Sequence, residues 1–101
     1  MRRHTVAVVI GTRPEAIKMA PVVLALRRHG DRVDTRVVAT AQHRELLDQA
    51  LEAFELTPDV DLDLMREDQV LADLTARLLE SLEALWRGMR PAVVLVQGDT
   101  T

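Results

Sequence analysis

The 101-residue chain has no cysteine, which excludes disulfide frameworks, cysteine-based zinc sites, iron–sulfur clusters and a thiol nucleophile from it. Aromatic residues make up only 2% of the chain; they are Phe54 and Trp86, and tyrosine is absent. Both lie in apolar positions of predicted helices, so we expect them in the core and expect no side chain here to stack on a nucleotide base.

Positive charge is not in excess, because 13 Lys and Arg face 16 Asp and Glu, for a formal net charge of −3. This balance argues against nucleic-acid binding. The N-terminal apolar run covers only residues 5–10, too short for a signal peptide or a membrane span, so we expect a cytoplasmic protein that does not bind membranes. With 48% hydrophobic and 29% charged residues, the chain has the composition of one folded domain.

Four segments have the patterns of β-strands. Residues 5–10 and 92–96 are apolar almost throughout, which is typical of parallel strands buried on both faces, and residues 35–40 are rich in β-branched side chains. Residues 59–64 alternate between polar and apolar side chains, which predicts a short edge strand.

Helical patterns lie between these segments. Thr12 and Glu15 have the spacing of a capping box at the start of a first helix, in which Pro21 predicts a kink or a restart. Residues 44–54 and 71–89 carry apolar side chains at helical spacing, with polar residues between them.

This alternation predicts an α/β fold: a Rossmann-like parallel sheet of four β-strands with three helices, in the spatial order 3-2-1-4. In that order the apolar strand 92–96 stands at an edge, although such strands usually have neighbours on both sides. We therefore expect the chain to be the N-terminal part of a larger protein, and expect the isolated chain to be marginally stable and prone to self-association.

Ligands of open α/β sheets bind beyond the carboxyl ends of the strands. The segments that follow the predicted strands are polar, with cations, amides, hydroxyls and a carboxylate, and they suit a phosphorylated polyhydroxy ligand. These segments are residues 11–18, 42–44, 65–69 and 97–100.

The first of these segments favours an anion such as a diphosphate. Gly11 makes the turn, a helix N-terminus follows, and Arg13 and Lys18 supply positive charge. Neither of the two common glycine-rich phosphate-binding motifs is present. Glu15 can be explained by capping alone, and Lys18 could be a solvated helix lysine.

Acid–base chemistry has one main candidate, Asp99, which follows Gly98 at the exit of the last apolar strand. The alternative is that Asp99 caps a following helix. His43 could donate to a phosphate or be a surface residue, and we interpret His4 and His29 as structural or solvated.

Three segments together resemble the non-hydrolysing UDP-N-acetylglucosamine 2-epimerase family: GTRPEAIKMAP at residues 11–21, TAQHRE at 40–45 and VLVQGDTT at 94–101. The spacing within residues 65–69 also fits, and the resemblance is collinear over essentially the whole chain. It implies the N-terminal part of a glycosyltransferase-B type fold, in which two Rossmann-like domains enclose the active site.

In that arrangement residues 1–101 form a partial N-terminal domain, and the remainder of this domain and the C-terminal domain are absent from the sequence. The resemblance implies interconversion of UDP-N-acetylglucosamine and UDP-N-acetylmannosamine by anti-elimination and re-addition of UDP. It further implies a cytoplasmic homodimer of cell-envelope polysaccharide biosynthesis that uses no cofactor and no metal.

The resemblance also assigns roles to residues of this chain. Arg13 and Lys18 would bind the diphosphate, and Asp99 would act as an acid–base residue. The remaining set would contact the ligand or a regulatory substrate site: Gln42, His43, Arg66 and Gln69. The charged run that begins at Arg66 departs from the more neutral loop of the family.

Further catalytic carboxylates and a histidine of the family would lie beyond Thr101. Two alternatives therefore stay open beside the epimerase. One is an inactive fragment or binding module, and the other is a different nucleotide-sugar enzyme of the same fold, such as a hydrolysing epimerase or a glycosyltransferase.

Overall fold

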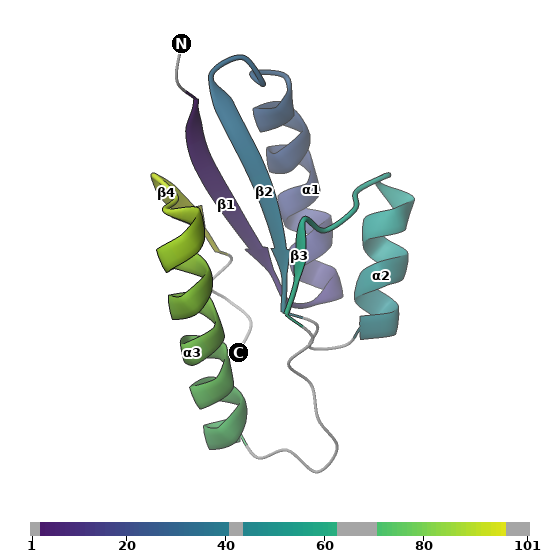
Figure 1. Cartoon of the computed structure of the whole chain (residues 1–101). Helices are drawn as coiled ribbons and strands as arrows, with labels where there is room; N and C mark the ends of the chain where they lie inside the picture. The colour runs from purple at the N-terminus through teal and green to yellow at the C-terminus, as the bar shows by residue number, and fades with distance from the viewer. Residues whose placement is uncertain (1–2, 41–43, 63–70, 97–101) are drawn as a thin grey trace.

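The computed structural model describes residues 3–40, 44–62 and 71–96. Strands and helices alternate along the chain from purple to yellow in Figure 1. They are β1 (His4–Ile10), α1 (Arg13–Arg27), β2 (Val33–Ala39), α2 (Arg44–Ala53), β3 (Val60–Asp61), α3 (Leu71–Met89) and β4 (Val93–Leu95). The predicted alternation is confirmed.

The strands form one parallel sheet in the order β3-β2-β1-β4, as predicted. The central pair is in register over its full length, from His4 beside Val33 to Ile10 beside Ala39. Both edge strands are shorter than predicted, and residues 63 and 64 of the expected third strand lie outside the described residues. The sheet is therefore built around β1 and β2.

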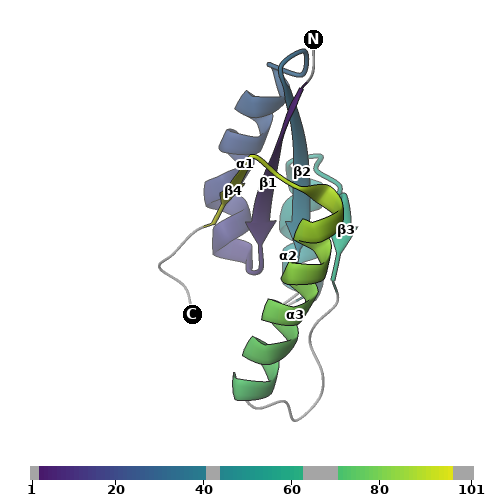
Figure 2. The ribbon, with the colours of Figure 1, turned by 60° about the vertical axis from the view of Figure 1, so that its left-hand side comes forward.

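The core lies between the sheet and the two helices α1 and α2. Alternate residues of β1 face these helices, and Val8 and Ile10 are fully buried there against the small side chains Ala16 and Ala20 of α1. The helix α2 adds Leu51, which is also fully buried. In Figure 2, α3 lies on the other side of the sheet from α1.

The helix α1 runs without interruption through Pro21, so of the predicted kink or restart the restart does not occur. Pro21 is exposed, and so is Ile17, which lies one turn before it. The flanking residues Ala20 and Val23 are completely buried on the opposite side. Burial of this face offsets the cost of about 3 kcal/mol that a proline imposes inside a helix.

The helix α3 is amphipathic, as predicted, but it is not part of the core. Every side chain in the described core cluster comes from β1, α1, β2, α2 or the segment after α2. Phe54 packs against that cluster, whereas Trp86 on α3 is half-buried and outside it, so the prediction of Trp86 as a core residue is wrong. Leu79 of α3 is 63% exposed.

Asp59 joins three elements at the edge of the sheet. Its carboxylate Oδ2 accepts the backbone N–H of Val37 at 2.7 Å, and its own N–H donates to the carbonyl of Val37 at 2.8 Å. The guanidinium of Arg27, at the end of α1, lies 3.8 Å from the same carboxylate. These contacts hold the start of β3 against β2.

No helix in the described part of the chain has the length and apolar character to cross a membrane.

Candidate functional site

The carboxyl ends of the strands meet at one rim, at the lower end of the sheet in Figure 1. Thr40, directly after β2, donates its backbone N–H to the carbonyl of Ile10 at the end of β1, at 3.0 Å. Leu62, after β3, donates to the carbonyl of Ala39 at 2.9 Å. Because ligands of open α/β sheets bind beyond these ends, the rim is the candidate site.

Gly11 begins the rim on the β1 side, and its buried position depends on the absence of a side chain. A Cβ at this position would lie 2.6 Å from the hydroxyl oxygen of Thr40 and 3.3 Å from Oε1 of Glu15. The glycine does not have a positive φ. It is therefore the close approach of the two strand ends, and not backbone conformation, that requires glycine here.

The capping box predicted for α1 is present, and its acidic side chain also binds the residue before the N-cap. Thr12 is the N-cap, in extended conformation, and its hydroxyl oxygen accepts the backbone N–H of Glu15 at 3.4 Å. Oε1 of Glu15 accepts the Thr12 hydroxyl at 3.0 Å and the backbone N–H of Gly11 at 3.2 Å. In an ordinary capping box the acid binds the N–H of the N-cap itself. Here it reaches the residue before the cap.

The two predicted cations lie in the first two turns of α1, and both side chains are exposed. Arg13 is the first helical residue, immediately after the capped turn. Lys18 follows five residues later, on a different side of a helix with about 3.6 residues per turn. The positive end of the helix dipole reinforces their attraction for an anion at the rim.

Comparison with known proteins identifies the family. The family model for UDP-N-acetylglucosamine 2-epimerase matches residues 24–101. The chain belongs to the UDP-N-acetylglucosamine 2-epimerase family. The family resemblance seen in the sequence is thereby confirmed.

Individual epimerases extend this match to the first 23 residues. The chain is 50% identical over 101 residues to UDP-N-acetylglucosamine 2-epimerase of Bacillus subtilis, with 100% of this chain and 26% of the relative covered. It is 55% identical over 96 residues to the Yersinia pestis enzyme, with 95% and 25% covered. The chain thus spans about a quarter of the length of these relatives.

Solved epimerase structures share the fold. The Neisseria meningitidis epimerase bound to UDP-GlcNAc is 48% identical with a TM-score of 0.86, over 95% of this chain and 26% of that one. The Methanocaldococcus jannaschii epimerase in complex with UDP-GlcNAc and UDP is 29% identical with a TM-score of 0.85, again over 95% and 26%. The predicted Rossmann-like α/β class is confirmed.

The described part of this epimerase-family chain brings together Gly11, Thr12, Arg13 and Thr40 at the rim. Lys18 lies one turn further along α1. The remaining predicted site residues lie outside the described residues; they are Gln42, His43, Arg66, Gln69 and Asp99. The roles of all of them, and those of Arg13 and Lys18, stay predictions.

Sequence reasoning missed two contacts of this site. The sequence pattern gives Thr40 no role, although its hydroxyl limits the space at Gly11. The same pattern explains Glu15 only as a cap, although its carboxylate also binds Gly11. A glycine directly after a buried strand is the local sign of a close approach. Which residue approaches it depends on the register between β1 and β2, and the sequence does not show that register.

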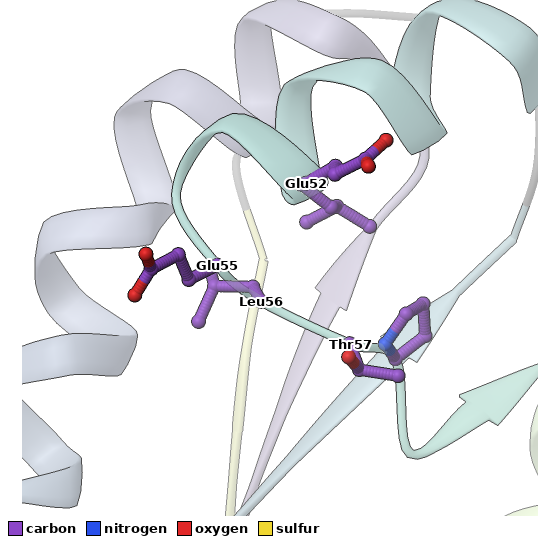
Figure 3. A pocket seen from close by; sticks show the side chains of 6 residues that line it. Glu52, Glu55, Leu56 and Thr57 are labelled. Carbon is purple, nitrogen blue, oxygen red and sulfur yellow. The ribbon is translucent and has the colours of Figure 1, made fainter.

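A separate hollow lies at the C-terminal end of α2, away from the rim (Figure 3). Glu52 and Glu55 line it beside Leu56 and Thr57, and the two carboxylates point away from each other in Figure 3. Two carboxylates repel a phosphate, so this hollow does not suit the ligand expected for the family. The rim remains the candidate site.

Proposed function

We propose that this chain is the N-terminal part of an enzyme that interconverts UDP-N-acetylglucosamine and UDP-N-acetylmannosamine. The observation that carries the proposal is the identity of 50% with a UDP-N-acetylglucosamine 2-epimerase over the whole chain. The rim supports it, because Arg13 and Lys18 provide positive charge where a nucleotide diphosphate would lie.

The reaction is an elimination followed by a re-addition. A base removes the proton at C2 of the sugar, the electrons form the C1–C2 double bond, and the C1–O bond breaks as UDP departs with its electron pair. UDP then returns to C1, and a proton is delivered to the opposite face of C2. A proton moves and no hydride does, so the reaction requires no nicotinamide.

Each proposed residue has a part in this sequence. Arg13 and Lys18 bind the diphosphate and stabilise the negative charge that develops on departing UDP. Asp99 is the acid–base residue at C2. The proposed contacts with the substrate or a regulatory UDP-sugar are Gln42, His43, Arg66 and Gln69.

We also propose the setting in which this chemistry takes place. Residues 1–101 form a partial N-terminal domain, and the rest of that domain and a C-terminal domain complete a glycosyltransferase-B type cleft. The full-length protein is a cytoplasmic homodimer that supplies cell-envelope polysaccharide synthesis. The family resemblance supports these proposals, as does the share of about a quarter of each relative that the chain covers.

The test is turnover in deuterated water by the full-length protein that contains residues 1–101. We expect either UDP-sugar to give a mixture of both, with deuterium at C2 of the product. Release of free sugar would instead indicate a hydrolysing epimerase. UDP binding without turnover would indicate a binding module, and turnover with the original hydrogen kept at C2 would exclude proton abstraction.

A further inference from the structure

The carboxylate of Glu15 closes a small ring of hydrogen bonds around the turn between β1 and α1. Oε1 accepts from the Gly11 N–H at 3.2 Å and the Thr12 hydroxyl at 3.0 Å, while the backbone N–H of Glu15 donates back to Thr12 at 3.4 Å. Two residues lie inside this ring, Arg13 and Pro14, and both are exposed. The ring therefore fixes the backbone from which Arg13 projects.

Glu15 does more than helix capping requires. Thr12 alone satisfies the Glu15 N–H, and the carbonyl of Thr12 accepts the N–H of Ala16 at 3.0 Å, so the first helical bonds form without the carboxylate. The additional bond to Gly11 ties α1 to the end of β1, where Gly11 approaches the Thr40 hydroxyl. Half-buried Glu15 thus connects the helix start with both strand ends.

The same bonds occupy donors that a phosphate would use in a glycine-rich loop. The N–H groups of Gly11 and Glu15 are bound internally, and Pro14 has no N–H. An anion at this turn therefore depends more strongly on side-chain cations. The direction of Arg13, one of the two proposed cations, therefore matters for binding.

We propose that Glu15 is a positioning residue, which holds the β1–α1 turn in the shape that directs Arg13 toward a bound diphosphate. The inference rests on the proposed function, which supplies the diphosphate ligand. Glu15 acts through its reach to Gly11 and not through its charge, since its charge would repel the ligand.

Two conservative variants of the full-length protein distinguish the effect of the length of the Glu15 side chain from the effect of its charge. Glu15→Gln keeps the length and an acceptor oxygen, so we expect UDP affinity within about twofold of the wild type. Glu15→Asp keeps the charge near the helix N-terminus but shortens the side chain, so we expect a loss of about five- to tenfold. Asp73→Ala, which removes an exposed acid from the first turn of α3, is the matched control and should leave UDP affinity unchanged.

A double-mutant cycle shows whether Glu15 acts through Arg13. We expect Glu15→Asp to weaken UDP binding in the wild type and to have no further effect in Arg13→Ala. Thermal unfolding of each variant checks that it is folded at the temperature of the binding assay.

The possible failures are distinct. A wild type that neither binds UDP nor turns over UDP-sugars would overturn the proposed function and this inference with it. A wild type that binds UDP while Glu15→Asp binds equally well, or loses the same factor in Arg13→Ala, would overturn the inference alone. A loss in Glu15→Gln as large as in Glu15→Asp would also overturn it, because the length of the side chain would then not be sufficient without its charge.

Discussion

Gly11 and Thr40 approach each other so closely, across the ends of β1 and β2, that a Cβ on Gly11 would lie 2.6 Å from the Thr40 hydroxyl oxygen. A separation below 3.0 Å forces a neighbour to move. The backbone of Thr40 is held by its hydrogen bond to Ile10, so it is the Thr40 side chain that would have to rotate away. The space at Gly11 is therefore set by the pairing of the two central strands.

Gly11→Ala should lower the free energy of unfolding by about 1–3 kcal/mol, the usual cost of forcing extra volume into a packed site. Chemical denaturation measures this change. Thr40→Ala should recover part of the loss, because it removes the oxygen that the new methyl group meets. Gly88→Ala is the control: nothing lies within 4 Å of a Cβ there, and alanine should stabilise α3 by about 0.5–1 kcal/mol.

Glu55→Gly should raise the free energy of unfolding by about 1 kcal/mol, because Glu55 has a left-handed φ of 57° that costs an L-residue energy. It ends α2 in a Schellman pattern, in which the N–H groups of Glu55 and Leu56 donate to the carbonyls of Glu52 and Leu51. Thermal unfolding should show a rise of about 4–8 °C. Glu52→Gly, inside the helix, should instead destabilise, and a fall in Tm for Glu55→Gly would contradict the argument.

Stability should depend on pH through Asp34. Hydrogen bonds of 2.9 and 3.0 Å from the Arg36 guanidinium hold the pKa of the Asp34 carboxyl below its usual value. The folded state thus favours the ionised form, so the stabilisation is present above the unfolded pKa of about 3.9 and disappears as the pH falls through the folded value.

The pair is partly exposed to solvent, so its contribution should not exceed about 1 kcal/mol. We expect Asp34→Asn to be less stable than the wild type at pH 7 and to approach it as the pH falls through the lowered pKa of folded Asp34. Urea denaturation across this range measures the difference. A gap that stayed constant with pH would show that the charge of Asp34 is not responsible.

The isolated chain should self-associate through β4, which lies at the edge of the sheet and exposes apolar side chains. Val94 is 38% exposed, and Val94→Lys should reduce association in sedimentation experiments. Ile17→Lys replaces a similarly exposed residue on α1, at 45%, and should leave association unchanged. Equal effects of both substitutions would indicate nonspecific hydrophobic contact.

The proposed catalytic roles predict different kinetic defects in the full-length protein. Arg13→Ala and Lys18→Ala should weaken UDP binding and slow elimination, because cations stabilise the charge on departing UDP. Asp99→Asn should keep UDP affinity and lower turnover by about two to four orders of magnitude. Similar affinity losses in all three variants would argue for a structural role of Asp99.

The sequence predicted those features that depend on local spacing or on chain alternation. The Thr12–Glu15 cap follows from a separation of three residues, and the strand order follows from the rules for parallel βα units. The contact of Gly11 with Thr40 and the bond from Val37 to Asp59 depend on register between distant strands. No local pattern carries that information.

Tertiary packing outweighs local preference at two positions, where a restart of α1 and a core tryptophan were expected. Pro21 favours a break in α1, but burial of Ala20 and Val23 keeps the helix continuous. Trp86 has the helical spacing of a core residue, but spacing shows only that one side of α3 is apolar, not whether another element covers it.

The position of α3 means that the parts of the molecule differ in how easily they unfold locally. Its 19 residues contribute nothing to the described core cluster, so separating them from the sheet sacrifices little of the burial that holds β1, β2, α1 and α2 together. Most of the stability of a helix in a protein comes from tertiary packing of its apolar face, and α3 has no side chain in that described cluster. Amide protons of α3 should therefore exchange with solvent through local opening. Those at the centre of β1 and β2 should exchange only when the whole domain unfolds.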